Sequence, residues 1–355
     1  VWFAVAYILW DTAYTLCDVP IFGIVTVMTE RIDERTSLLS YKSIWSGLGA
    51  GIATIVATVL VGENVGLSFG LGALIIAVFS FAVMMPVSYN VKERIQAVED
   101  EKFTLRRMFR YLFQNKYLLI YYVGYLFHAG FGVSGSLMLL VSYYMFHNSQ
   151  FSLFILALSV LPMLICALLV PKLIARFDKM KLYLLCCLLN IIFSIATWVA
   201  GYDSIVVFSV LSVLRSIPAA FAGVTMFMFT PDCAEYGKFR SGIEAKGITF
   251  ALQTFMAKLT GAISGSLGLF LLKFFDWTAV RAESFQDLQK LAIQQSGTAM
   301  SGLWFIYNMI PVIGMVIAFI IWCFYRLRDK EVQIMADANS GKIEREEALR
   351  LLAKH

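Results

Sequence analysis

Long uninterrupted apolar runs dominate the pattern of this chain. Several of them match the roughly 20 residues that an α-helix needs to cross a bilayer. They extend over Ile44–Val61, Leu67–Val87, Phe151–Leu173, Leu182–Ala200 and Ile205–Thr230. Within the runs, apolar residues do not alternate with polar ones, as the strands of a membrane barrel require. The pattern therefore predicts an all-α polytopic membrane protein.

Composition supports this prediction. The 355 residues are 59% apolar and 15% charged, whereas soluble domains are about 45–50% apolar and about 25% charged. Hydropathy, charge and turn residues together predict nine spans. We place them near residues 1–28, 38–61, 67–89, 117–146, 151–173, 181–200, 204–230, 247–275 and 298–325.

The basic residues predict the orientation. Most of the 29 Lys and Arg residues fall on alternate loops and on the C-terminal tail, and cytoplasmic loops retain positive charge. We therefore expect the tail to be cytoplasmic and Val1 to lie outside. The net charge of +5 follows from this topology, so we expect no nucleic-acid partner.

The long charged stretch 90–116 divides the predicted spans into three before it and six after it. Transporters are often built from two six-span halves. We therefore expect residues 1–89 to be the remaining three helices of an N-terminal half whose first three helices are missing. Residues 90–116 are then the central cytoplasmic loop, 117–326 the C-terminal six-helix half and 327–355 the cytoplasmic tail.

Enzymatic and structural-metal functions have no support in the sequence. The six Cys and three His residues show no metal-ligand spacing. The sequence also shows no nucleophile–base pair and no phosphate-binding loop. We expect neither an enzyme nor a structural metal site.

Two acids on the first span are the strongest functional candidates. Asp11 and Asp18 lie seven residues apart, so on a helix they fall within about 20° of each other. Tyr14, Thr15 and Phe22 share this face. Carboxylates with a neighbouring hydroxyl suit a small cation or a proton, and acids at membrane depth usually serve function. The alternative is that both acids are structurally paired and the face packs against neighbouring helices.

The eighth predicted span carries a complementary charge. Lys258 shares one helical face with Thr254, Gly261 and Gly265, and Gln253 lies beside Thr254. The small residues predict a close approach of another helix. The alternative for Lys258 is a side chain that extends to the cytoplasmic surface.

Arg215 is a third charge within the predicted spans, and a direct role and a structural pairing remain equally open for it.

Two loops mix both charge signs, and such residues can form ion pairs that break as a transporter opens inward. The alternative is a solvated loop that follows the charge rule. The candidate cytoplasmic gate residues are Arg31, Glu34, Arg35, Lys42, Asp232, Glu235, Tyr236 and Arg240.

Two segments resemble a known family. YILWDTAYTLCDVPIFGIVTVMTERIDERTSLLSYK is similar to the fourth helix and following loop of the glycoside–pentoside–hexuronide:cation symporters, a melibiose-permease-like branch of the major facilitator superfamily. DCAEYGKFRSGIEAKGITFALQTFMAKLTG resembles that family's segment from helix ten to helix eleven. The resemblance covers essentially the whole chain, as helices four to twelve of twelve.

The resemblance implies roles for individual residues. By its position, Asp18 contacts both the sugar and the coupling cation. Thr15 supplies a hydroxyl to the cation, and Tyr14 lines the sugar pocket. Lys258 lies near the same site and pairs with Asp18 when the site is empty. Its polar neighbours in the family match Gln253 and Thr254 here.

The sequence departs from the family at three positions. Phe22 stands where a sugar-stacking Trp is found, so substrate preference can differ. Lys42 or Ser43 stands where an Arg is usual. Asp11 occupies a position where a small residue is expected, and we count it as a further candidate cation ligand.

The resemblance implies a symporter that imports a glycoside, pentoside or hexuronide with Na⁺ or H⁺ by alternating access. We expect no cofactor besides that cation, and a monomer among membrane lipids in a bacterial inner membrane. One alternative keeps the fold and transports an anionic or amphiphilic solute. Arg215 supports this alternative, because an anionic substrate needs a buried cation. The other is a transport-dead membrane sensor.

Overall fold

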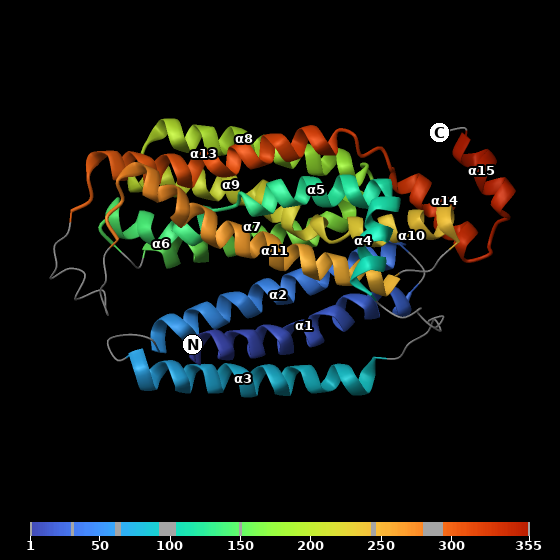
Figure 1. Cartoon of the computed structure of the whole chain (residues 1–355), viewed down its shortest axis with the longest axis horizontal. Coiled ribbons are helices and arrows are strands. Elements are labelled where there is room, and N and C mark those ends of the chain that lie inside the picture. The colour runs from blue at the N-terminus through green and yellow to red at the C-terminus, as the bar shows by residue number, and fades with distance from the viewer. Residues whose placement is uncertain are drawn as a thin grey trace.

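The computed structural model describes residues 2–29, 32–60, 65–91, 104–148, 151–242, 246–279 and 294–353. This part of the chain forms helices and contains no strand. Three long helices come first: α1 (Trp2–Met28), α2 (Ile32–Leu60) and α3 (Val65–Asn90). In Figure 1 they form one group, the three-helix group, that lies along one side of the remaining helices.

The remaining long helices make up a second group, called here the bundle (Figure 1). Its members are α5 (Lys116–Gly130), α6 (Ser134–Tyr144), α7 (Phe151–Ile174), α8 (Lys179–Ala200), α9 (Ile205–Met226), α10 (Phe229–Ser241), α11 (Lys246–Leu272), the 3₁₀ turn η1 (Lys273–Phe275) and α13 (Gly297–Trp322). Three short helices complete the fold: α4 (Leu105–Gln114), α14 (Asp329–Asn339) and α15 (Arg345–Ala353).

The predicted spans coincide with these helices. Six segments of the bundle are long and apolar enough to cross a membrane, and they match the last six predicted spans. The first three predicted spans are helices of 27, 29 and 26 residues, which at 1.5 Å per residue exceed the roughly 30 Å of a hydrocarbon core.

Three segments differ from the sequence-based expectation. The span predicted over 117–146 is broken into α5 and α6 at Phe131–Val133, between two glycines that weaken a helix. The charged stretch after the seventh span, expected to be a loop, is largely α10. Gly242 ends this helix in the left-handed conformation with φ +72°. In the tail, the sequence of residues 337–355 predicts one short surface helix, whereas the structure has two, α14 and α15.

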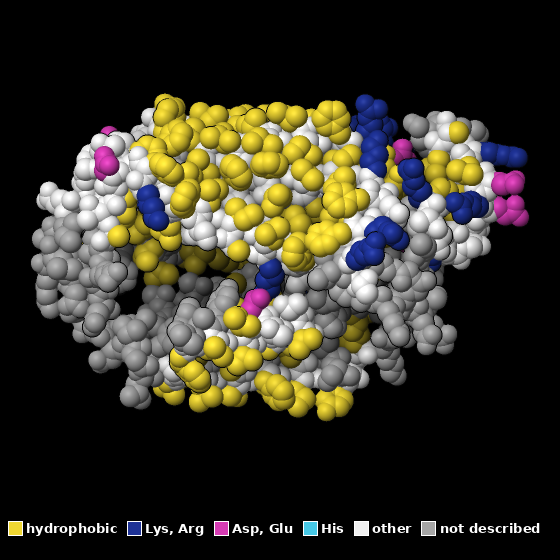
Figure 2. All heavy atoms as spheres, in the orientation of Figure 1, with side chains coloured by type: hydrophobic (Ala, Val, Ile, Leu, Met, Phe, Trp, Pro, Cys, Tyr) yellow, Lys and Arg dark blue, Asp and Glu magenta, His cyan; other side chains and the backbone are white. Residues whose placement is uncertain are grey.

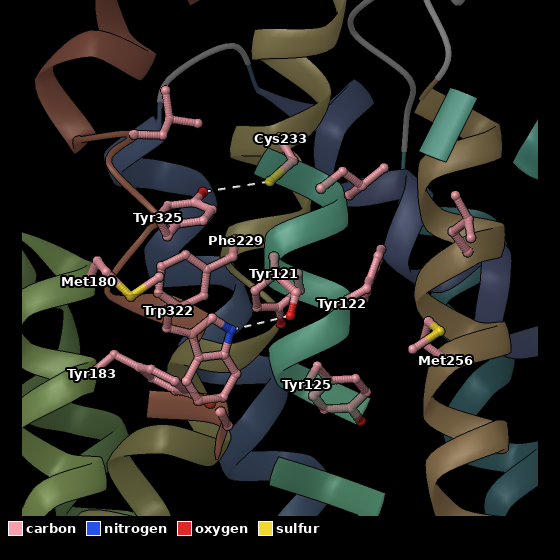
Figure 3. Close-up of a cluster of buried hydrophobic side chains, with 14 of the residues drawn as sticks. Tyr121, Tyr122, Tyr125, Met180, Tyr183, Phe229, Cys233, Met256, Trp322 and Tyr325 are labelled. Carbon is pink, nitrogen blue, oxygen red and sulfur yellow. Dashed lines mark hydrogen bonds between the residues drawn. The ribbon is translucent and has the colours of Figure 1, made fainter. Parts of the chain in front are cut away.

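An aromatic cluster in the core of the bundle holds α5 against α8, α10 and α13 (Figure 3). Trp322 is fully buried, and its indole N–H donates to the carbonyl oxygen of Tyr121 at 3.2 Å. The ring of Tyr183 contacts Trp322 edge-on at 4.8 Å between centroids. Phe229 packs against both tyrosines. Indole and phenol groups thus bury large areas while the indole N–H keeps a partner.

Close helix packing depends on glycines of α5 and α13. A Cβ atom at Gly124 would lie 2.2 Å from the indole nitrogen of Trp322. At Gly314 it would lie 2.5 Å from the carbonyl oxygen of Phe127. Among the described residues, a Cβ atom at Gly261 or Gly265 would meet nothing within 4 Å, so the close approach of another helix at these glycines stays a prediction. Small residues permit contact, but the facing helix decides whether it occurs.

The outer faces of the helices carry large apolar side chains. Figure 2 shows them spread over the visible side of the bundle. On α3, Leu74, Val78 and Phe81 are each more than half exposed. Such a surface suits hydrocarbon, which also surrounds the outer faces of membrane helices.

Candidate functional site

An ion pair connects the three-helix group to the bundle. The ammonium group of Lys258 on α11 donates to Oδ1 of Asp11 on α1. The two side chains are 33% and 32% exposed, so water reaches both. A pair with this exposure contributes on the order of 1 kcal/mol, which is weak enough for an entering solute or ion to replace it.

Two aromatic rings of α1 surround this ammonium group. Lys258 Nζ lies 4.3 Å from the ring centroid of Tyr14 and 5.8 Å from that of Trp10. The two rings are stacked at 5.9 Å, because they lie one helical turn apart. Cation–π attraction adds to the ion pair. The resulting site combines a carboxylate, an amine and flat apolar faces.

The polar neighbours on α11 are buried beside this pair. Gln253 is 2% exposed and Thr254 is 5% exposed. The side-chain amide of Gln253 and the hydroxyl of Thr254 have no hydrogen-bond partner within the described residues. Buried polar groups usually have partners, so these two are available to a polar ligand.

The structure places the predicted residues of α1 as follows. The Thr15 hydroxyl donates to the carbonyl oxygen of Asp11 at 2.8 Å, which leaves its lone pairs free to accept. The side chains of Asp18 and Phe22 lie outside the described residues, although both positions belong to α1. The structure pairs Lys258 with Asp11. The expected pairing of Lys258 with Asp18, and the predicted roles of Asp18 and Phe22, stay predictions.

A second polar site lines a large cavity. The cavity has a volume of about 1040 Å³ and lies between α2 and the helices α6, α7 and α9. Arg215 on α9 lines it and donates from Nη2 to the hydroxyl of Ser134 at 2.9 Å. The Arg215 guanidinium also lies 5.9 Å from the ring centroid of Tyr307. The predicted gate residue Lys42 lines the same cavity.

The predicted gate residues of α10 lie at the end of the bundle next to α14 (Figure 1). Asp232 pairs with the ammonium group of Lys179, which also lies 3.4 Å from Asp329. Lys179 and Asp232 are only 3% and 8% exposed. Close by, the hydroxyl of Tyr325 lies 3.5 Å from Cys233 Sγ.

The other gate residues are placed separately. Glu235 is buried, and its carboxylate accepts from Asn339 of α14 at 2.9 Å. Arg240 is exposed and donates to the hydroxyl of Tyr236 at 2.9 Å. Glu34 accepts from the hydroxyl of Thr29. The side chains of Arg31 and Arg35 lie outside the described residues.

Sequence reasoning missed two residues of these sites. Trp10 lies one turn before Tyr14 on the predicted face, and that spacing was a usable signal. Lys179 was assigned only to the positive loops, because its partners Asp232 and Asp329 are far away in sequence. No local pattern indicates such a pairing.

Comparison with known proteins identifies the family. The family model "MFS/sugar transport protein" matches residues 1–329. The isoprimeverose transporter of Lactiplantibacillus pentosus is 25% identical over 95% of this chain and 70% of its own length. The glucuronide carrier protein homolog of Escherichia coli (strain K12) is 23% identical over 93% of this chain and 71% of its own.

Two further similarities extend the comparison. A putative sulfoquinovose importer of Salmonella typhimurium is 27% identical over 74% of this chain and 57% of its own length. Among solved structures, the major facilitator superfamily transporter FucP in its outward conformation matches with a TM-score of 0.54 at 15% identity, over 87% of this chain and 72% of that one. The fold is thus that of the major facilitator superfamily.

The family consists of transporters, not enzymes, and the six membrane-length segments of the bundle agree with this. The chain is therefore an integral multi-pass membrane protein that belongs to the MFS/sugar transport protein family.

Proposed function

We propose that this protein is a symporter that moves a sugar or sugar derivative together with Na⁺ or H⁺ by alternating access. The observation that carries the proposal is the Lys258–Asp11 pair between the two groups of helices. An ion pair between the two groups can open when ligands arrive and reform when they leave.

The residues around the Lys258–Asp11 pair are suited to bind both the coupling cation and the sugar. Carboxylate oxygen is the preferred ligand of small hard cations, and Asp11 supplies it. By resemblance, Asp18 and Thr15 complete the cation site. The rings of Trp10 and Tyr14 are suited to the apolar face of a sugar. The unpartnered groups of Gln253 and Thr254 are suited to its hydroxyls, since unmatched polar groups favour ligands that pair with them.

The named relatives support a sugar as cargo. They include an isoprimeverose transporter, a glucuronide carrier homolog and a putative sulfoquinovose importer. The first name indicates a neutral glycoside and the other two indicate acidic ones. The cargo we propose is therefore a glycoside, with its charge left to the next subsection.

The test is uptake in proteoliposomes that contain the purified protein. Imposed sodium and proton gradients are applied separately, with isoprimeverose and with a methyl glucuronide as radiolabelled solutes. We expect at least one solute to accumulate above equilibrium under one of the two gradients. Downhill entry that neither gradient accelerates would overturn cation coupling, and no entry of any glycoside would overturn the sugar assignment.

Single substitutions test whether the uphill accumulation depends on the proposed site. We expect Lys258→Ala and Asp18→Asn to abolish uphill accumulation while the protein inserts normally. Lys273→Ala is the matched control, because Lys273 lies near the end of the same span and, among the described residues, its amine contacts only the ring of Phe270, at 5.9 Å from the ring centroid. Uphill uptake by Asp18→Asn at the wild-type rate would contradict the assigned role.

A further inference from the structure

The break in the fourth predicted span creates an open helix N-terminus inside the bundle. Helix α6 begins at Ser134, and no side chain caps its first turn. The first backbone N–H groups of a helix have no partner within that helix. Together with the helix dipole they form a partial positive charge. The hydroxyl of Ser136 is directed at the carbonyl oxygen of Val133 and so does not cap these groups.

Arg215 adds a full positive charge at the same point. Its Nη2 atom donates to the Ser134 hydroxyl at 2.9 Å, and that hydroxyl donates to the carbonyl oxygen of Tyr307 at 2.8 Å. Ser134 is thereby fixed in place, and most of the guanidinium donors are left for another partner. Within the described part of the chain, no carboxylate pairs with Arg215.

This arrangement lacks a negative partner. Two positive groups, a guanidinium and a helix N-terminus, meet at Ser134, although like charges at such a distance repel each other. A charge at membrane depth that has no partner is costly, and such charges usually mark a ligand pathway. An anion placed between the two groups would turn repulsion into two attractions.

The geometry also provides room for a ligand. Arg215, Ser134 and Gly135 all line the cavity of about 1040 Å³, whereas sites for small ligands usually measure roughly 300–1,000 Å³. Ser212 and Ser216, which lie on α9 within one turn of Arg215, line it as well. The cavity therefore has space for the charged part of a solute, while the residues around Lys258 do not line it.

We propose that Arg215 and the N-terminus of α6 bind the carboxylate or sulfonate group of an acidic glycoside. The inference rests on the proposed function, because it names the charge of the transported solute. The edge of a guanidinium group donates two parallel hydrogen bonds to two oxygens of a carboxylate or a sulfonate. Free backbone N–H groups at a helix N-terminus bind the same oxygens. The hydroxyls of a neutral glycoside accept hydrogen bonds but bring no negative charge to balance either group.

The experiment measures binding to the purified protein by thermal stabilisation and by counterflow in proteoliposomes. The probes are methyl β-glucuronide and methyl β-glucoside, which differ only in the acidic group, and inorganic sulfate. For the wild type we expect the glucuronide to bind at least about tenfold more tightly than the glucoside, since such charged pairs contribute about 1.5–3 kcal/mol.

Variants separate recognition of charge from folding. We expect Arg215→Gln to weaken glucuronide binding about tenfold or more and glucoside binding less than twofold. Arg215→Lys retains the charge without the planar group, and we expect an intermediate loss. Arg176→Gln is the matched control, because Arg176 is exposed at the end of α7, away from the cavity lining. Equal losses for both glycosides in Arg215→Gln would overturn the proposal.

Two other outcomes would overturn different statements. If the wild type binds the glucoside as tightly as the glucuronide, the anion site is wrong while sugar transport stands. If neither glycoside binds, the proposed function itself is wrong. Sulfate that stabilises the protein through Arg215 without competing with the glucuronide would show a site for a free anion and overturn the assignment to the solute.

Discussion

Gly314 gives a sharp test of how the bundle is packed. It lies on α13 where this helix crosses α5, next to the break before α6. A Cβ atom there would lie 2.3 Å from Cβ of Phe131 and 2.5 Å from the carbonyl oxygen of Phe127. Ordinary carbon contacts are about 3.5–4.0 Å. In Gly314→Ala the helices must therefore separate by roughly 1 Å, because neither a backbone oxygen nor a Cβ atom can rotate away.

The expected effect follows from this overlap. Overpacking of a core costs about 1–3 kcal/mol, and more where the backbone must move. The matched control is Gly261→Ala on α11, where a Cβ atom meets no atom of the described residues within 4 Å. That change removes flexibility from the unfolded chain and stabilises by about 0.4–1 kcal/mol. The two variants should differ by about 2–4 kcal/mol.

Thermal unfolding measures the difference. Cys166, Cys186, Cys187 and Cys233 are buried free thiols, so a thiol-reactive dye reports their exposure during heating in detergent. At 2–4 °C per kcal/mol, the cost of about 1–3 kcal/mol predicts that Gly314→Ala lowers the apparent Tm by about 2–12 °C and that Gly261→Ala raises it slightly. A wild-type Tm for Gly314→Ala would refute the packing argument.

Four further variants give three predictions about the remaining contacts. Lys179→Met should lower the apparent Tm more than Asp329→Asn does, because removing one partner of a buried pair costs about 3–5 kcal/mol, whereas Asp329 is 31% exposed; the reverse order of Tm values would contradict this. Trp322→Phe should cost about 1–2 kcal/mol, because it removes the buried hydrogen bond from the indole N–H to the Tyr121 carbonyl oxygen; an unchanged Tm would show that the hydrogen bond contributes nothing. Tyr14→Leu should weaken glycoside binding severalfold at unchanged Tm, since it removes the ring beside Lys258; unchanged binding would remove this ring from the sugar site.

The helices and the facing charges follow from local signals. Hydropathy and the distribution of basic residues are read within windows of about one span, and the helices of the structure match the spans derived from them. An acid on α1 opposite Lys258 was also predictable, because a buried charge needs a partner. These features depend on residue type and spacing alone.

Which acid meets Lys258 depends on tertiary structure. Asp11 and Asp18 share one face of α1, so only the offset between α1 and α11 along their axes decides between them. Similarly, α10 was interpreted as a loop because of its charges, but Asp232 and Glu235 are buried there by Lys179 and Asn339 from distant segments. The break before Ser134 had a local signal in the Gly-Phe-Gly sequence at Gly130–Gly132, which averaging over a whole span conceals.

The two charged sites together predict how transport responds to voltage. With one cation bound near Asp11 and one acidic group bound at Arg215, the ligands that move carry no net charge. A neutral glycoside carried with the same cation moves one positive charge, which a potential of 100 mV favours by about 2.3 kcal/mol. Uptake into proteoliposomes at potentials set by potassium and valinomycin measures this difference. We expect uptake of the glucuronide to be insensitive to the potential and uptake of the glucoside to rise as the inside becomes negative. An equal voltage response for both solutes would mean that the acidic group and the cation are not carried together.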